Sequence, residues 1–403
     1  MPFVPHRRDA INRVFISRLY ILIFVIIPGV HRMPIEFIGM IGTRRASELD
    51  IPTVSIHGGS IDPDYVRKFT KAHEDGDFDR VLVGYGSTGP DGLTVASFAA
   101  NGTERIGFLI AHRPGFVAPT LFARKAATLD HFTNGRIAVH IITGGSDAEQ
   151  QRDGDWLDHD TRYRRTDEYL DIVRRIWTSD TPFDYEGEFY RFKNAFSDVK
   201  PLQKPHIPLY FGGASSAAVP VGAKHSNVYA MWGEPIAAVK ERIREVKAAA
   251  PKGHSLRFSV SLRPILGDTE EKAWEKARSI LLRIKEIRTA NNIENQPGSP
   301  YLVSARPQAV GSNRLLQFAT ESEIFDKRLW TPIAAATGAY GNTTALVGTP
   351  EQVAESLFDY YEAGVTTLLI RGFSPLEDAI AYGRDVIPLV RAAVQQREQQ
   401  IVA

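Results

Sequence analysis

The chain has 403 residues, with 48 Lys or Arg and 47 Asp or Glu, so its formal net charge is +1. This balance, without a basic run, argues against a nucleic-acid-binding protein. The chain contains no cysteine, which excludes disulfides, thiolate catalysis and cysteine-ligated metal centres. These features are compatible with a reducing cytoplasm, and we expect a cytoplasmic protein.

The first segment in chain order is an apolar run at residues 19–30. Four arginines precede it: Arg7, Arg8, Arg13 and Arg18. The pattern imitates a signal peptide, but it is shorter than the about 20 residues that span a bilayer. No Ala-x-Ala-like cleavage site precedes Met33. We interpret residues 1–32 as an extension ahead of a true start at Met33, with a targeting segment or a membrane anchor as the alternatives.

From Met33 onward, apolar strands alternate with amphipathic helices. Eight strands are predicted at Glu36–Ile41, Arg80–Tyr85, Arg105–His112, Arg136–Thr143, Ile207–Gly213, Asn227–Gly233, Arg257–Leu266 and Thr366–Gly372. Eight helices are predicted at Asp62–Gly76, Gly92–Ala100, Ala118–His131, Thr161–Trp177, Ser216–Lys224, Ile236–Ala249, Thr269–Ile287 and Leu376–Val394. Near-continuous apolar strands indicate burial on both faces, as in a parallel sheet.

Eight alternations over about 360 residues fit a closed (β/α)8 TIM barrel, which we place at residues 33–398. No GxGxxG sequence follows the first strand, so a Rossmann domain is not expected. The alternation breaks once, between the seventh and eighth strands, where residues 286–347 form a long insertion. Such an insertion at the carboxyl face of a barrel is typically a lid or a substrate loop. A packing arm at a subunit interface is the alternative.

Active sites of TIM barrels lie at the carboxyl ends of the strands. The fourth strand ends in ThrGlyGlySerAsp at residues 143–147, and a polar loop leads to a helix that opens around Asp160. Two glycines at a strand end let a backbone or a ligand approach closely. His159 and Tyr163 add hydrogen-bonding groups around that opening.

The fifth strand ends in GlyGlyAlaSerSer, residues 212–216, which opens directly into a helix. Free backbone N–H groups and the helix dipole favour an anion at such a position. The hydroxyls of Ser215 and Ser216 add donors. The motif alone is weak, because many barrels use a Gly-Ser turn merely to begin a helix. Together with residues 143–147 and the HisAspThrArgTyr loop, it predicts a phosphate-binding site.

Several further motifs follow one another in order along the chain. They are ArgProGlyPheValAlaProThr (113–120), AlaAlaThrLeuAsp (126–130), AsnGlyArg (134–136), ProLeuTyrPheGlyGly (208–213), TrpGlyGluPro (232–235) and AlaLeuValGlyThrPro (345–350). Their order and positions resemble the luciferase-like flavin-dependent monooxygenases, especially the alkanesulfonate monooxygenase branch. The resemblance covers nearly everything after Met33.

The resemblance implies FMN as the cofactor. It places the phosphate at Tyr163, Ser215 and Ser216, and the ring near Thr143, Gly144 and His159. Gly213 completes the cofactor-binding set of residues.

The resemblance also implies a two-component enzyme, whose reduced FMN comes from a separate NAD(P)H:flavin reductase. Oxygen would add to the flavin C4a position and give a (hydro)peroxyflavin. The first substrate expected is an organosulfur compound, a sulfonate or sulfone, cleaved at its C–S bond. A homodimer or homotetramer is expected.

The substrate side departs from that branch. Its Arg-x-His on the seventh strand reads Ser261-Leu262-Arg263 here, and its Tyr-x-His after the eighth reads Phe373-Ser374-Pro375. Arg263 and Arg371 still supply two guanidinium groups at strand ends, and such groups suit oxyanions. An anionic substrate is one interpretation. Pairing of both arginines with nearby carboxylates is the other.

Two further residues are candidates for the active site. His112 at the end of the third strand could lie over the flavin and donate to a peroxide oxygen, or it could be a structural residue. Trp232 could form a wall beside the flavin ring, or belong to the core. The chain has no HxxxH or HExxH spacing, and we expect no metal site.

Three other functions stay open. The enzyme could oxidise a carbon substrate, or it could be a deazaflavin-dependent enzyme that transfers hydride. The third is a non-catalytic relative that only binds FMN.

Overall fold

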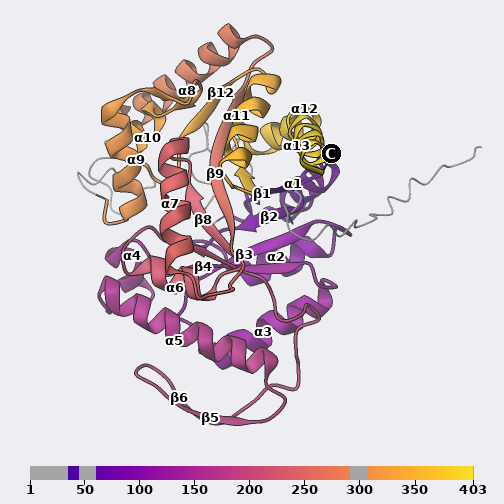
Figure 1. Ribbon diagram of the computed structural model, residues 1–403, viewed down its shortest axis with the longest axis vertical. Coiled ribbons are helices and arrows are strands. Elements are labelled where there is room, and N and C mark those ends of the chain that lie inside the picture. Colours follow the sequence, from indigo (N-terminus) through magenta and orange to yellow (C-terminus); the bar gives the residue numbers. More distant parts are fainter. Residues whose placement is uncertain (1–34, 45–59, 291–306, 403) are drawn as a thin grey trace, which may run out of the picture. The chain divides into compact units, whose positions relative to one another are not determined.

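The computed structural model describes residues 35–44, 60–290 and 307–402. The predicted strands form a closed parallel barrel, with ends that shift by no more than two residues (Figure 1). They are β1 (Glu36–Ile41), β2 (Arg80–Val83), β3 (Gly107–His112), β4 (Ile137–Ile142), β7 (Leu209–Gly212), β8 (Val228–Trp232), β9 (Arg257–Leu266) and β13 (Thr367–Ile370). Neighbours pair in chain order, and β13 closes the ring by pairing with both β9 and β1. The predicted (β/α)8 architecture is confirmed.

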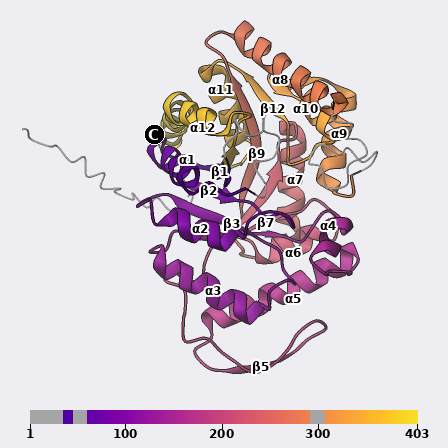
Figure 2. The same cartoon turned by 180° about the vertical axis from the view of Figure 1, so that it is seen from behind.

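Helices surround the barrel (Figure 2). They are α1 (Pro63–Asp75), α2 (Gly92–Ala100), α3 (Pro119–Phe132), α5 (His159–Thr178), α6 (Ala218–His225), α7 (Ile236–Ala249), α8 (Glu270–Ala290), α11 (Pro350–Glu362), α12 (Pro375–Asp385) and α13 (Ile387–Val402). The predicted helix Leu376–Val394 is instead two helices that meet at Val386. Helix α11 is missing from the prediction.

Side chains fill the middle of the barrel. A small apolar cluster contains Ile38, Leu109, Ala138, Tyr210 and Val228, one from each of five strands. Since side chains alternate along a strand, these positions identify the inward face of each strand. The larger cluster lies between the strands and the helices.

Below this layer, the carboxylate of Glu36 occupies the amino end of the barrel. It accepts hydrogen bonds from Arg80 Nε and from the Tyr210 hydroxyl, both at 2.7 Å. The two cationic residues Arg80 and Arg257 hold the pKa of this buried carboxyl below its usual value, against the effect of burial. The amino end of the barrel is therefore held by a structural ion network.

The predicted insertion contains a second, smaller sheet. Its described elements are α9 (Val310–Glu321), β10 (Ile324–Phe325), β11 (Leu329–Trp330), α10 (Pro332–Thr337) and β12 (Ala345–Gly348). Strand β9 extends beyond the barrel, and β12 pairs with this extension from Arg263 to Leu266. Helices α9 and α10 pack together, with α10 beside α8 (Figures 1 and 2).

Two other elements are absent from the prediction. They are the short helix α4 (Asp147–Arg152) and the antiparallel hairpin of β5 (Phe183–Glu186) and β6 (Arg191–Ala195). In residues 35–44, 60–290 and 307–402, no helix is long and apolar enough to cross a bilayer. The predicted N-terminal extension, residues 1–32, and residues 291–306 of the insertion lie outside the described residues.

Candidate active site

The carboxyl end of the barrel is open to solvent on its inner face. Inward positions that are partly exposed include Gly84, His140, Ile142, Gly212, Trp232 and Arg371. Their outward neighbours are buried, namely Val83, Ile141, Phe211, Met231 and Ile370. Two of these inward positions are glycines, Gly84 and Gly212, and the other four carry larger side chains that are partly accessible to solvent. We call this partly exposed inner face the recess; it lies at the end where TIM barrels place their active sites.

Tyr163 of α5 lies beside the recess, on the outer side of β7. The ring is 6% exposed and packs against Phe211 of β7, with ring centroids 6.3 Å apart. Its hydroxyl shares a hydrogen bond with Ser215. Burial raises the pKa of the Tyr163 hydroxyl, so this group keeps its proton and remains a donor at neutral pH.

The turn from β7 into α6 faces that hydroxyl. A Cβ on Gly213 would lie 3.0 Å from the Tyr163 hydroxyl oxygen and 2.7 Å from Cβ of Ala218. The Tyr229 hydroxyl donates to the Gly213 carbonyl over 2.6 Å and fixes the turn. Only glycine fits this turn without displacing its neighbours.

The two serines of the turn differ. Ser215 is buried, and its Oγ accepts a 3.2 Å hydrogen bond from the Ala218 amide at the start of α6. Ser216 is exposed. Two hydroxyls, the Tyr163 hydroxyl and the amides at the amino end of α6 are a donor set that suits a phosphate. The predicted phosphate residues are therefore brought together.

The residues predicted to lie near the flavin ring are connected to the phosphate residues by α5. Thr143 is buried, and its Oγ1 lies 3.2 Å from Oγ1 of Thr166, one turn after Tyr163 on α5. His159 lies one turn before Tyr163, with its ring 5.0 Å from the Tyr163 ring and its Nδ1 2.6 Å from Asp160. The ends of β4 and β7 and the start of α5 thus converge.

Gly144 has a positive φ of 109°, and Gln150 of α4 packs against its Cα. The Gln150 amide donates to the Thr143 carbonyl over 2.7 Å, and its oxygen accepts from Arg113 over 3.1 Å. Gln150 is completely buried. A side chain at position 144 would clash with Gln150, so the hydrogen-bonded turn requires glycine there. The same glycine also lets a ligand approach the backbone.

His112 does not face the recess. Its Nε2 lies 2.8 Å from the Tyr169 hydroxyl of α5, and its ring stacks on Phe122 of α3 at 3.6 Å. Both partners lie outside the barrel wall. Burial lowers the pKa of His112 to about 3, so the ring stays neutral. This position does not match an expected position over the flavin, and it favours the structural alternative.

His140 is a recess residue that the sequence analysis missed. It lies two residues after Ala138 on β4 and therefore on the inward face. Its ring fits beside Gly212, where a Cβ would lie 3.2 Å from Cε1. Its buried Nδ1 has no hydrogen-bond partner in the described part of the chain. Burial lowers the pKa of His140 to about 4, so the ring is a neutral group on the inner face of β4.

The two candidate arginines have different surroundings. Arg263 lies on the extension of β9 and is fully buried. Its Nε donates to the Asn342 carbonyl over 3.1 Å, and its guanidinium lies 4.7 Å from the Phe373 ring centroid. Arg371 follows β13 and is partly exposed; it contacts the Gly341 carbonyl and, at 3.3 Å, the Met40 Sδ.

The insertion reaches across the recess from two anchors. Next to α9, the Gln308 amide donates to Asp147 over 3.0 Å, and Asp147 also pairs with the buried Arg162 at 2.8 Å. From α9, Arg314 makes a two-pronged ion pair with Glu234 at 2.7 and 2.5 Å. These anchors follow β4 and β8 respectively.

Trp232 lies at the end of β8, beneath α9. The side chain packs with Leu315 and Ala334 of the insertion. A Cβ on Gly311 would lie 3.3 Å from the Trp232 ring, so the absence of a side chain there lets α9 lie close to the indole. Trp232 therefore connects the inner wall of the barrel to the insertion.

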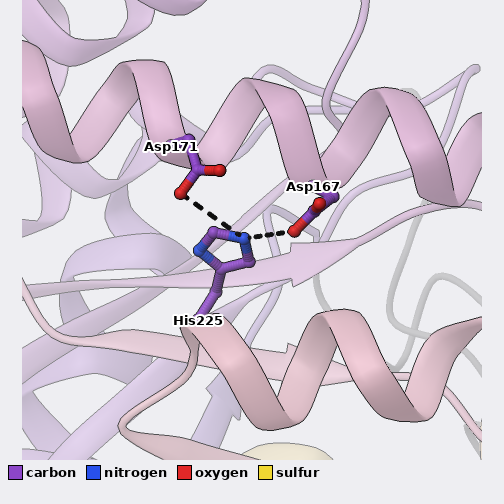
Figure 3. A group of neighbouring side chains, drawn as sticks. All are labelled: Asp167, Asp171 and His225. Atoms are coloured by element: carbon purple, nitrogen blue, oxygen red, sulfur yellow. Dashed lines mark hydrogen bonds and ion pairs between the residues drawn. The ribbon is translucent and has the colours of Figure 1, made fainter. Parts of the chain in front are cut away.

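A group with metal-ligand chemistry lies apart from the recess, between α5 and α6 (Figure 3). His225 Nε2 lies 2.6 Å from Asp167 Oδ1 and 4.0 Å from Asp171 Oδ1. The ammonium of Lys224 lies 2.9 Å from Asp167 and 2.8 Å from Asp171. Hydrogen bonds from His225 and Lys224 lower the pKa of Asp167 to about 2. A lysine thus already neutralises these carboxylates, and the group ties α6 to α5.

Comparison with known proteins gives a family match. Residues 36–367 match the family described as luciferase-like monooxygenase. Similar solved structures include a riboflavin lyase with modified FMN and riboflavin (TM-score 0.70, 19% identity, covering 90% of this chain and 92% of that chain). Another is EDTA monooxygenase from Chelativorans sp. BNC1 (0.68, 18%, 90% and 94%). A third is a long-chain alkane monooxygenase (0.67, 18%, 91% and 92%). At these identities the likeness concerns the fold.

Proposed function

Because the chain belongs to the luciferase-like monooxygenase family, we propose that it is an FMN-dependent monooxygenase supplied with reduced FMN by a separate NAD(P)H:flavin reductase. The observation that carries FMN is the convergence of Tyr163, Gly213 and Ser215 at the start of α6. It brings hydroxyl and amide donors to one point, where a phosphate group would be held.

When bound, reduced FMN supplies the two electrons that divide O2 between the product and water. The residues of the chain perform binding, orientation and exclusion of water. Tyr163, Ser215 and Ser216 hold the phosphate, while Thr143, Gly144 and His159 lie on the side of the ring. His140 contributes a neutral ring on the inner face of β4, and α9 covers Trp232 and limits the access of bulk water from the side of β8.

The substrate that we propose first is an organosulfur compound, a sulfonate or sulfone. One oxygen atom of O2 enters the carbon next to sulfur, the C–S bond breaks, and the second oxygen atom leaves as water. An aldehyde and sulfite result from a sulfonate, or an aldehyde and a sulfinate from a sulfone. The order of the sequence motifs supports this class, and detection of sulfite separates it from oxidation at a carbon substrate without sulfur.

The proposal is tested by replacing the two serines of the turn between β7 and α6, which together with Tyr163 and Gly213 we call the cradle. We expect Ser215→Ala combined with Ser216→Ala to weaken the binding of reduced FMN about tenfold, because charge-assisted hydrogen bonds of about 1.5–3 kcal/mol are lost. Anaerobic fluorescence titration measures this affinity. Unchanged affinity would place the phosphate elsewhere on the protein.

A further inference from the structure

The guanidinium of Arg371 has no carboxylate within ion-pair distance among the residues that the structure describes. It contacts the Gly341 carbonyl and the Met40 sulfur, and it also interacts electrostatically with Tyr340. Burial lowers the pKa of Arg371 to about 10, yet the group remains charged at neutral pH. A desolvated cation without a counter-charge is unfavourable in a folded protein. Such a group commonly belongs to a binding site.

The position of Arg371 separates it from the proposed cofactor residues. In the ring of eight strands, β13 is four steps from β4, which carries Thr143, and three steps from β7, which carries the cradle. Arg371 therefore lies across the recess from Thr143. It follows Leu369, an inward residue of the middle layer, and its contact with Met40 of β1 places it on the same inner wall.

Arg371 is the more accessible of the two arginines. It borders a cavity of about 10 Å³ that is also lined by Phe69 and His73 of α1 and by Tyr382 of α12. That volume has room for about one water molecule and not for a substrate. Arg371 is partly exposed, whereas Arg263 is completely buried under the insertion. Of the two arginines, Arg371 is thus the one that a ligand in the recess can reach.

We infer that Arg371 receives a single oxyanion group of the substrate, a carboxylate or a sulfonate, which supplies the missing counter-charge. This inference rests on the proposed function and deepens it, since it assigns the anionic end of the substrate to β13 and leaves Arg263 as a structural residue. A guanidinium binds such oxygens through paired N–H donors. Arg371 is then a residue that determines specificity for anionic over neutral substrates.

The test uses full-length protein and isothermal titration, with and without saturating FMN. Methanesulfonate and acetate are the anionic probes, and dimethyl sulfone is a neutral probe of similar size to methanesulfonate. We expect both anions to bind and dimethyl sulfone to bind at least tenfold more weakly. Arg371→Met should weaken binding of the anions tenfold or more, and Arg371→Lys should retain part of it. Arg397→Met, on the outer helix α13, is the matched control and should bind as the parent does.

Three results would overturn the inference. They are equal binding of the neutral and anionic probes, no binding of either anion up to 100 mM, or unchanged anion affinity in Arg371→Met. If Arg371→Met does not fold, the wild-type comparison of methanesulfonate with dimethyl sulfone and the Arg371→Lys variant still decide the question. FMN affinity is measured separately in each variant. If the parent protein binds the anions but not FMN, the proposed cofactor function is contradicted and Arg371 remains an anion site. Selective loss of FMN binding in Arg371→Met would assign its charge to the cofactor instead.

Discussion

A Cβ atom on Gly213 would lie 3.0 Å from the hydroxyl oxygen of Tyr163. Because Gly213 has no side chain, Tyr163 of α5 can lie directly against the turn between β7 and α6. This contact joins α5 to the start of α6 and underlies the proposed phosphate site.

Gly213→Ala should disturb this site, because the added methyl group displaces either Tyr163 or α6. We expect affinity for reduced FMN to fall at least tenfold, with a small loss of stability from the contact with Ala218. Gly102→Ala is the matched control, since a Cβ there meets only ordinary contacts of 3.7 Å or more. Equal affinity of the two variants in anaerobic titration would argue against the Tyr163–Gly213 cradle.

His140 is expected to act as a neutral hydrogen-bonding group. Replacement by Leu removes the unpartnered Nδ1, and we expect kcat to fall about tenfold, the effect of losing one hydrogen bond of about 1.4 kcal/mol. Since burial lowers the pKa of His140 to about 4, the rate of the wild-type enzyme should show no inflection from this residue between pH 5.5 and 8. Steady-state rates across that range check both points. An inflection near pH 6.5 that disappears in His140→Asn would show that the ring titrates and would contradict this role.

The ion pair between Arg314 and Glu234 should control how well the recess excludes water. Arg314→Met leaves Glu234 without its two-pronged partner and loosens α9 over Trp232. We expect a several-fold larger share of reduced FMN to be lost as hydrogen peroxide instead of oxygenated product, because water then reaches the site. Arg397→Met, which loses a similar pair with Glu362 on the outer helices, should keep the parental product yield. A product yield in Arg314→Met equal to that of the parent would mean that α9 does not shield the reaction.

Stability should decrease in acid because the fold lowers the pKa of three histidines and keeps them neutral. Burial lowers the pKa of His73 and His140 to about 4 and of His112 to about 3. In the unfolded chain each histidine binds a proton near pH 6.5, so below this pH the unfolded state binds protons that the folded state does not bind. The free energy of unfolding should therefore fall as the pH drops from about 6.5 towards 4, by up to about 1.4 kcal/mol per pH unit for each group.

Urea unfolding at pH 7.5 and pH 5.5 measures this loss. His112→Asn should show a smaller difference between the two pH values than the parent. Equal unfolding free energies of the parent at both pH values would show that these rings accept protons in the folded state.

The sequence predicted the barrel because each strand and helix carries its own apolar pattern and end signals. Arg257–Leu266, Gly92–Ala100 and Ile236–Ala249 agree with the structure at both ends. Helix α11 was missed although Thr349 and Gln352 form a capping box at its start, a signal that the sequence contains. It follows directly after the irregular insertion, where the alternation had already broken.

The orientation of single side chains was harder to predict. Barrel strands are buried on both faces, so their apolar runs do not alternate and the inward face cannot be identified from the sequence. His112 and His140 both lie on such strands, yet only His140 lies on the inward face. The position of Arg263 was difficult to predict for a related reason, because β9 continues past the barrel to pair with β12. The register of the strands is needed to tell which of these residues face the recess.

The central claim is that this chain binds reduced FMN and uses it with oxygen. The most direct measurement is anaerobic titration with reduced FMN, followed by mixing with oxygenated buffer in a stopped-flow spectrophotometer. We expect saturable binding and an oxygen-dependent transient absorbance that precedes the appearance of oxidised FMN, and the transient should weaken in Gly213→Ala. Binding without any transient would instead favour hydride transfer or simple storage of flavin. No binding at all would contradict the account.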